Sequence, residues 1–153
     1  MRCLKTKSLT VFSFSLLVLF SYALPCLAAE YASVNKDGVN IRSGPGTKDE
    51  VLWEVFKDFP LEIIKREGKW AKTKDFEGDT GWIYSPLLSK NKKVIVKVEV
   101  ANMRTGPGQN YEPVASVKYG VVFTPIETEG DWLKVVHEDG TKGWIYKKLL
   151  WPN

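Results

Sequence analysis

The sequence predicts an all-β protein in which two small barrels follow one another after an N-terminal leader. Three observations support this prediction. The chain repeats itself at an offset of 62 residues. Strand-like alternation of apolar and polar residues recurs in both copies, between glycine, proline and acidic turns. No stretch after the leader carries the 3.6-residue apolar period of a helix.

Residues 1–29 have the features of a cleaved secretory signal peptide. A basic start without acidic residues precedes an apolar run of about a dozen residues and a small-residue exit. Cleavage after Ala28 or after Ala29 fits this pattern. An uncleaved anchor would need roughly 20 apolar residues, and acylation of Cys26 is disfavoured by Pro25. We therefore expect export to the periplasm, the cell surface or the medium, without stable membrane insertion after cleavage.

The charge of the protein depends on this leader. The whole chain has 22 Lys and Arg against 18 Asp and Glu, a net charge of +4. The leader contributes Arg2, Lys5 and Lys7, so residues 30–153 keep 19 basic and 18 acidic side chains. A nearly neutral chain lacks the positive field that binds a polyphosphate backbone. Nucleic acid is therefore excluded as a partner.

Both cysteines, Cys3 and Cys26, also fall in the leader. The mature chain can then form no disulfide, hold no thiolate metal site and use no cysteine nucleophile. It must be stabilised by its core alone.

The rest of the chain is a duplication. Pairing residues 31–91 with 93–153 gives 21 identities in 61 pairs without a gap. This predicts two domains of one type, residues 30–90 and 91–153, joined by the short polar segment 89–93. The best-matched segments are 40–46 with 102–108, 67–70 with 129–132, and 81–84 with 143–146.

Each copy is expected to hold five short strands, a number that favours a closed barrel because closure removes exposed sheet edges. We expect the domains to fold independently, residues 93–153 alone included. The expected strands are 39–42, 51–56, 61–65, 70–74 and 81–84 in the first copy, and 94–103, 114–117, 121–126, 132–136 and 143–146 in the second.

The repeated motifs resemble those of the bacterial SH3 domain family. They are Asn-x-Arg-Ser/Thr-Gly-Pro-Gly at 40–46 and 102–108, a following Gly-x-Trp, and Gly-Trp-Ile-Tyr with Leu-Leu at the end. The resemblance implies two SH3-like barrels of a kind found mostly on exported or cell-wall proteins. Members of the family are usually targeting or binding modules, and some bind peptidoglycan peptides. Tyr84 and Tyr146 stand where eukaryotic SH3 domains have a groove proline, which argues against proline-rich ligands.

Aromatic residues supply the candidate binding site. Alternation along each final strand places Ile83 and Ile145 in the core and their neighbours on the opposite face, which we expect to be at least partly exposed. Such a face suits a peptide or sugar groove. Alternatively, the rings pack between the barrels or cover the rim of the core. The candidate ligand-binding residues are Trp70, Trp82, Tyr84, Trp132, Trp144, Tyr146, Arg42 and Arg104.

Two further features of the repeated motif have structural explanations. Arg42 and Arg104 suit a carboxylate ligand, but a local acid or backbone carbonyl is the commoner partner of such an arginine. The Gly-Pro-Gly loop is explained by turn chemistry, with ligand contact as the alternative.

No catalytic or cofactor site is expected. His137 is the only histidine, so no catalytic triad or histidine metal site can be assembled. Asp75, Glu77 and Asp79 superficially suggest a calcium loop, but Pro86 occupies the position of the closing glutamate. We expect neither a metal nor an enzyme activity.

The sequence therefore predicts a non-catalytic exported binding module. The favoured ligand is peptidoglycan or a wall peptide, and the alternative is an exported protein partner that the chain serves as a scaffold without glycan affinity. Residues 30–90 carry 10 basic and 11 acidic groups and residues 91–153 carry 9 and 7. Neither domain has a strong field, so we expect binding by aromatic stacking rather than by charge.

Overall fold

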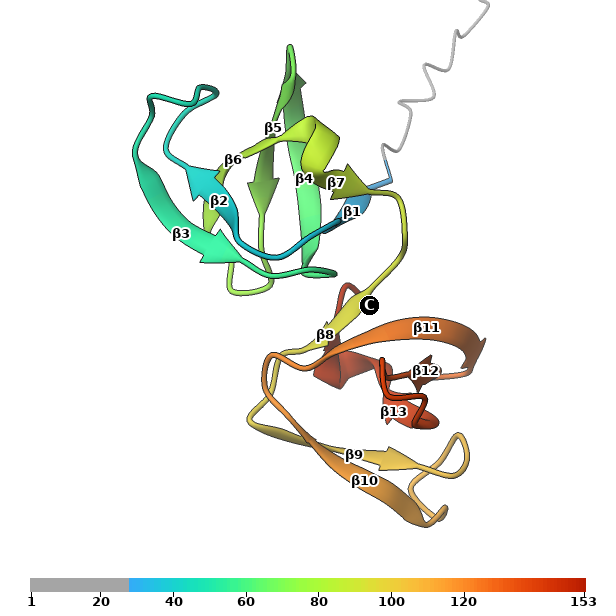
Figure 1. Cartoon of the computed structure of the whole chain (residues 1–153). Helices are drawn as coiled ribbons and strands as arrows, with labels where there is room; N and C mark the ends of the chain where they lie inside the picture. Colours follow the sequence, from blue (N-terminus) through green and yellow to red (C-terminus); the bar gives the residue numbers. More distant parts are fainter. Residues whose placement is uncertain (1–27) are drawn as a thin grey trace, which may run out of the picture.

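The computed structural model describes residues 28–153, and each repeat forms one antiparallel sheet of seven strands (Figure 1). The first sheet has the order β3-β2-β6-β5-β4-β1-β7. A 3₁₀ turn, η1 (Ser85–Leu87), joins the two strands that come last along the chain, β6 and β7. The strands are β1 (Glu30–Val34), β2 (Val39–Arg42), β3 (Val51–Val55), β4 (Pro60–Glu67), β5 (Trp70–Lys74), β6 (Thr80–Tyr84) and β7 (Leu88–Ser89).

The second sheet repeats this order as β10-β9-β13-β12-β11-β8-β14. Its 3₁₀ turn, η2 (Lys147–Leu149), again precedes the last strand. The all-β prediction with two equivalent sheets is confirmed. The strands are β8 (Val94–Val96), β9 (Val100–Arg104), β10 (Pro113–Lys118), β11 (Val122–Glu129), β12 (Trp132–Val136), β13 (Lys142–Tyr146) and β14 (Leu150–Trp151).

The structure has more strands than the sequence predicted. In each repeat a short first strand pairs with a two-residue last strand, as Ser33 and Val34 of β1 do with β7. The expected continuous strand 94–103 is two strands, β8 and β9, because residues 97–99, with a bend at Val98 and Glu99, separate them. The last strands have two residues each, which is too short to show a period, and β1 ends in three consecutive buried residues, so it shows no alternation either.

Each sheet curls around its own apolar cluster. Along β2, Val39 and Ile41 are buried whereas Asn40 and Arg42 are half-buried, which is the expected alternation. Ile83 and Ile145 are 0% exposed, so their prediction as core residues is confirmed.

A glycine allows β2 and β6 to cross closely. A Cβ added at Gly81 would collide with Ile41 Cγ2 and would lie 3.2 Å from the carbonyl oxygen of Arg42. Gly143 faces Met103 and the carbonyl oxygen of Arg104 in the same way. The glycine of the Gly-Trp-Ile-Tyr motif is therefore required by packing in both domains.

The two domains contact each other through residues that differ between the repeats. Ile95 of β8 is 0% exposed and belongs to the core cluster of the first domain, whereas its neighbours Val94 and Val96 belong to the second. Strand β8 thus contributes to both cores. Further contacts join Tyr31 to Trp151, with ring centroids 5.4 Å apart, and Lys93 Nζ to Asp58, at 3.0 Å.

Tyr119 makes a further contact between the domains, which is partly aromatic and partly polar. Its ring packs on Phe76, with centroids 5.2 Å apart, and its hydroxyl donates a hydrogen bond to the carboxylate of Glu77. This hydrogen bond, aided by burial, raises the pKa of Tyr119 from 10.0 to about 12.

We expect Tyr119 to ionise at a higher pH than a tyrosine without this hydrogen bond, whose pKa is 10.0. In an alkaline titration followed by tyrosinate absorbance, wild-type protein should show one tyrosine titrating near 12. Because folding raises this pKa, the contribution of Tyr119 to stability is complete below pH 10 and is lost as the pH rises through about 12. The Tyr119→Phe variant should lack only the late step. If the step that disappears in this variant lay near pH 10 instead, the Glu77 contact would be contradicted.

The expected signal peptide and both cysteines lie in residues 1–29. Only Ala28 and Ala29 of this segment are among the described residues; residues 1–27 lie outside them. In the described part of the chain, no helix has the length and apolar character needed to cross a membrane.

Candidate functional site

An aromatic pair marks the same place in each domain. Trp70 begins β5 and Tyr84 ends β6, and the two residues are directly opposite in the antiparallel register. Their ring centroids are 5.6 Å apart at an interplanar angle of 62°. Both side chains are half-buried, so each packs on the sheet and keeps part of its ring accessible.

A cavity of about 390 Å³ lies elsewhere, between the domains, but the first aromatic pair has a pocket of its own, about 310 Å³ in volume. β2 forms the wall opposite the rings, with Asn40 and Arg42. The loop after β2 contributes Thr47, so part of the Gly-Pro-Gly region does border the pocket. The complete lining is Lys36, Gly38, Val39, Asn40, Arg42, Thr47, Trp70, Tyr84 and Leu87.

The arginines hold the neighbouring loops. Arg42 Nη1 donates a hydrogen bond of 2.8 Å to the backbone carbonyl of Asp49, and Arg104 Nη1 donates one of 2.8 Å to that of Tyr111. A backbone carbonyl is one of the local partners that the sequence suggested. Arg42 thus holds the loop after β2 and also lines the pocket.

The second domain has the same aromatic pair with different surroundings. Trp132 and Tyr146 have ring centroids 5.7 Å apart at 54°. Lys148 Nζ lies 6.0 Å from the centre of the Tyr146 ring, at the position that Pro86 takes in the first domain. Two polar or small residues of the first pocket, Lys36 and Gly38, correspond to Val98 and Val100. The two pairs therefore present different surfaces to a ligand.

The prediction that Trp82 and Trp144 are exposed is wrong. Their side chains are only 8% and 6% exposed. They do lie opposite the core isoleucines, but that face is covered as well: Trp82 is flanked in register by Arg42 and Lys72, and Lys65 Nζ lies 4.8 Å from its ring centre.

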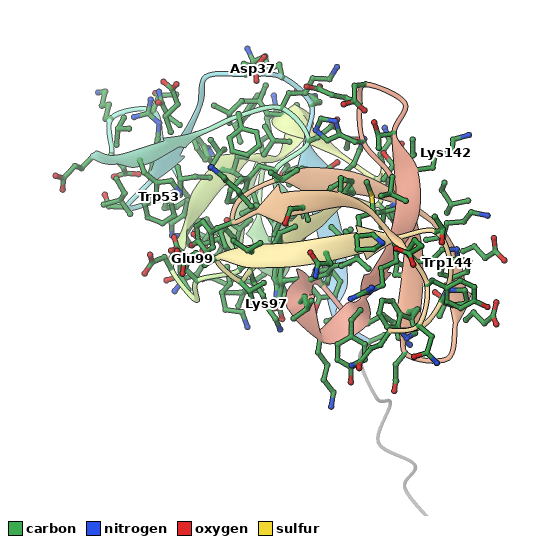
Figure 2. All side chains as sticks on the ribbon, turned by 90° about the horizontal axis from the view of Figure 1, so that it is seen from below. Asp37, Trp53, Lys97, Glu99, Lys142 and Trp144 are labelled. Atoms are coloured by element: carbon green, nitrogen blue, oxygen red, sulfur yellow. The ribbon has the colours of Figure 1, made fainter. Side chains whose placement is uncertain are left out.

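Trp144 is covered in the same manner. Lys134 Nζ lies 5.5 Å from the centre of its ring, and Arg104 pairs with it in register. Figure 2 shows Trp144 among the crowded side chains of the second domain. Long basic side chains bury their stems on apolar surface while their charge stays in water, and the ammonium group is attracted to the ring face. The two tryptophans are therefore packing residues.

The acidic residues after β5 form a structured turn. The carboxylates of Asp75, Glu77 and Asp79 lie within 4.8 Å of one another. Asp75 Oδ1 accepts hydrogen bonds from the backbone N–H groups of Glu77 and Asp79, at 3.0 and 2.9 Å. Burial nevertheless raises the pKa of Asp75. Asp75 of this cluster thus stabilises the turn, and Glu77 accepts the hydrogen bond from Tyr119.

The equivalent turn of the second domain holds the only histidine. His137 Nδ1 lies 3.1 Å from the Asp139 carboxylate. Asp139 Oδ1 accepts a hydrogen bond of 2.8 Å from the N–H of Thr141, which lowers the pKa of Asp139. His137 also packs on Phe123, with ring centroids 5.5 Å apart. These contacts give His137 a structural role in the turn.

Comparison with known proteins agrees with this architecture. A curated relative is named as an N-acetylmuramoyl-L-alanine amidase, YrvJ, of Bacillus subtilis (strain 168). The identity is 27% over an alignment of 130 positions, which covers 78% of this chain and 25% of the relative. This chain therefore spans only about a quarter of that protein.

Solved structures give weaker matches. NlpC2 from Trichomonas vaginalis matches at a TM-score of 0.36 and 14% identity, over 82% of this chain and 49% of its own. An NlpC/P60 family protein from Bacillus cereus ATCC 10987 matches at a TM-score of 0.37 and 13% sequence identity. The match covers 78% of this chain and 55% of that protein's chain.

Comparison with models of protein families identifies both repeats. The model of the bacterial SH3 domain matches twice, at residues 35–90 and 97–152, and so covers most of the chain. The two matches correspond to the two sheets and contain both aromatic pairs. This chain belongs to the bacterial SH3 domain family and carries two such domains in tandem.

Proposed function

We propose that this protein is an exported, non-catalytic binding module that recognises peptidoglycan or a wall peptide through the aromatic pairs of its two domains. The observation that carries this proposal is the pocket of about 310 Å³ in which Trp70, Tyr84 and Arg42 meet. Stacking surfaces bordered by a few polar groups are typical of sites for peptides and sugars.

Membership of the family and the relative support this assignment. Bacterial SH3 domains are binding modules, and the Bacillus subtilis relative is named for an activity on the bond between N-acetylmuramic acid and L-alanine. A protein that shares its SH3 region with such an enzyme would meet the same polymer. We place it in the periplasm or on the cell surface, in agreement with the basic and apolar leader.

The burial of Trp82 and Trp144 narrows the proposed site. Rings that are less than a tenth exposed cannot stack on a ligand without unfolding their surroundings. The contact residues proposed are therefore Trp70 and Tyr84 in the first domain, and Trp132 and Tyr146 in the second. Arg42 and Arg104 shape the neighbouring loops.

We expect Trp70→Ala to weaken retention of residues 30–153 on purified peptidoglycan sacculi. Truncation of a ring at a binding hot spot typically costs about 2 kcal/mol or more, which is roughly thirtyfold in affinity. The Trp132→Ala variant tests the second pair, and the double variant tests avidity, because two linked weak sites reinforce each other on a polymer. Co-sedimentation at low and moderate salt measures the effect, which should depend little on salt.

Two controls accompany this experiment. Trp70→Phe keeps an aromatic face and should retain most of the binding. Leu52→Ala removes an exposed apolar side chain of β3 outside the pocket and should have no effect. Equal retention of wild type and the double variant would contradict wall recognition by these rings. Capture of an envelope protein instead of sacculi would favour the scaffold alternative.

A further inference from the structure

A second cavity lies between the two domains and shares no lining residue with the aromatic pocket. Its volume is about 390 Å³. Its lining residues come from the start of β1, from the joint between the domains, and from β8, β11, β12, η2 and β14 of the second domain. Its apolar surface includes Tyr31 of the first domain and Val94, Leu133 and Leu150 of the second. The site therefore exists only when both domains are docked.

The charged side chains that line this cavity are all cationic. Lys90, Lys92, Lys93 and Lys147 line it, and no aspartate or glutamate does. Lys93 Nζ is already engaged, at 3.0 Å from Asp58 and 2.9 Å from Thr124 Oγ1. Within residues 28–153 the other three lysines form no ion pair.

The unpaired lysines give the cavity an excess of positive charge. Like charges brought together by folding repel one another, and an anion between them would remove this cost. The near-neutral composition of the chain hides this local excess, because the balancing acids lie elsewhere.

Contacts at the joint hold the cavity in shape. Ser33 Oγ donates a hydrogen bond of 2.9 Å to the carbonyl oxygen of Asn91, and Asp58 binds Lys93. Asp58 itself has a left-handed backbone, with φ of 68°, at the position that Gly120 takes in the second repeat. These contacts hold the backbone of the segment that carries Lys90 and Lys92, at Asn91 and through the side chain of Lys93, so a ligand would meet a backbone that is already in place.

We propose that the cavity between the domains binds an anion, a carboxylate or phosphate group that carries an apolar part. The anionic group lies among Lys90, Lys92 and Lys147, and the apolar part packs on Tyr31 and Leu133. This site differs from the aromatic pocket in position and in chemistry. It does not depend on the wall-binding proposal, because its walls and its charges are independent of Trp70 and Tyr84.

Soluble probes test this proposal on residues 30–153, a chain that contains every described strand. The probes are acetyl-Leu-Glu, which has two carboxylates, its neutral counterpart acetyl-Leu-Gln amide, and phenyl phosphate. Backbone amide shifts in nuclear magnetic resonance spectra report binding at the joint and at Leu133. We expect saturable shifts there with acetyl-Leu-Glu or phenyl phosphate, none with the neutral peptide, and weaker binding as salt is raised. The anion that binds more tightly identifies the chemical source.

Charge variants locate the site. Lys92→Gln and Lys147→Gln should each weaken binding about two- to fivefold, the range expected for one exposed ion pair. Lys142→Gln, at the start of β13 and away from the cavity, is the matched control and should change nothing (Figure 2). Trp70→Ala should also leave anion binding intact, which separates this test from that of the wall proposal. Shifts that appear equally with the neutral peptide, or that survive both lysine changes, would overturn the proposal.

Discussion

Trp82→Ala is expected to unfold much of the first domain rather than to remove a contact with a ligand. The side chain is 8% exposed, and replacement of a buried aromatic residue by alanine costs about 3–5 kcal/mol. A small domain has little more stability than that to lose. Urea denaturation followed by circular dichroism should show a large drop in the midpoint, and Trp144→Ala should have the same effect on the second domain.

Two comparisons make this expectation specific. Ile83→Ala, on the other face of the same strand, should cost about 2–5 kcal/mol because Ile83 is fully buried. Trp70→Ala should cost less, since Trp70 is only half-buried. If Trp82→Ala left the midpoint unchanged and Trp70→Ala collapsed the domain, the roles assigned to these two tryptophans would have to be exchanged.

Ile95→Ser is expected to uncouple the two domains. Serine is the residue at the equivalent position of the first repeat, Ser33, so the strand itself should tolerate it. In the whole protein the change removes a fully buried side chain from the first core cluster, at a cost of about 2–5 kcal/mol. Calorimetry should then show two separate unfolding transitions in place of a coupled one.

The isolated second domain provides the control. In residues 93–153 alone, Ile95 has lost its partners in the first domain, so Ile95→Ser should change stability little. The fragment itself should still fold, because Val94 and Val96 of the same strand remain in its own core. An equal cost of Ile95→Ser in the fragment and in the whole protein would mean that Ile95 serves only its own domain.

The repeat explains why so much of the fold could be predicted. Two copies of one pattern without a gap fix the positions of strands and turns twice, and Ile83 and Ile145 are found where alternation places them. Alternation failed at Trp82 and Trp144 because it tells which side of a strand a residue faces but not what covers that side. The cover comes from Lys65 on β4, two strands away from β6, and from Lys134 on β12, the neighbour of β13; their ammonium groups lie over the rings.

The contact between the domains was also missed, although the sequence carries a signal for it. A repeated fold needs the same residue type at equivalent core positions, so a pair that is polar in one copy and apolar in the other marks a surface used only once. Ser33 and Ile95 form such a pair. Lys57 with Tyr119 and Ser89 with Trp151 are two more, and all three apolar members lie at the contact.

The difference between the two domains at their contact determines whether further copies of the protein can associate head to tail. A head-to-tail contact between like units is able to repeat without end and to produce fibres. Here the second domain offers Ile95 and Tyr119 to the first. Its own surface has Glu138 where the first domain has Phe76, so another molecule cannot dock on it in the same way. The docking surface of the first domain is therefore occupied by the second domain of the same chain, and we expect no head-to-tail association of further molecules through this contact.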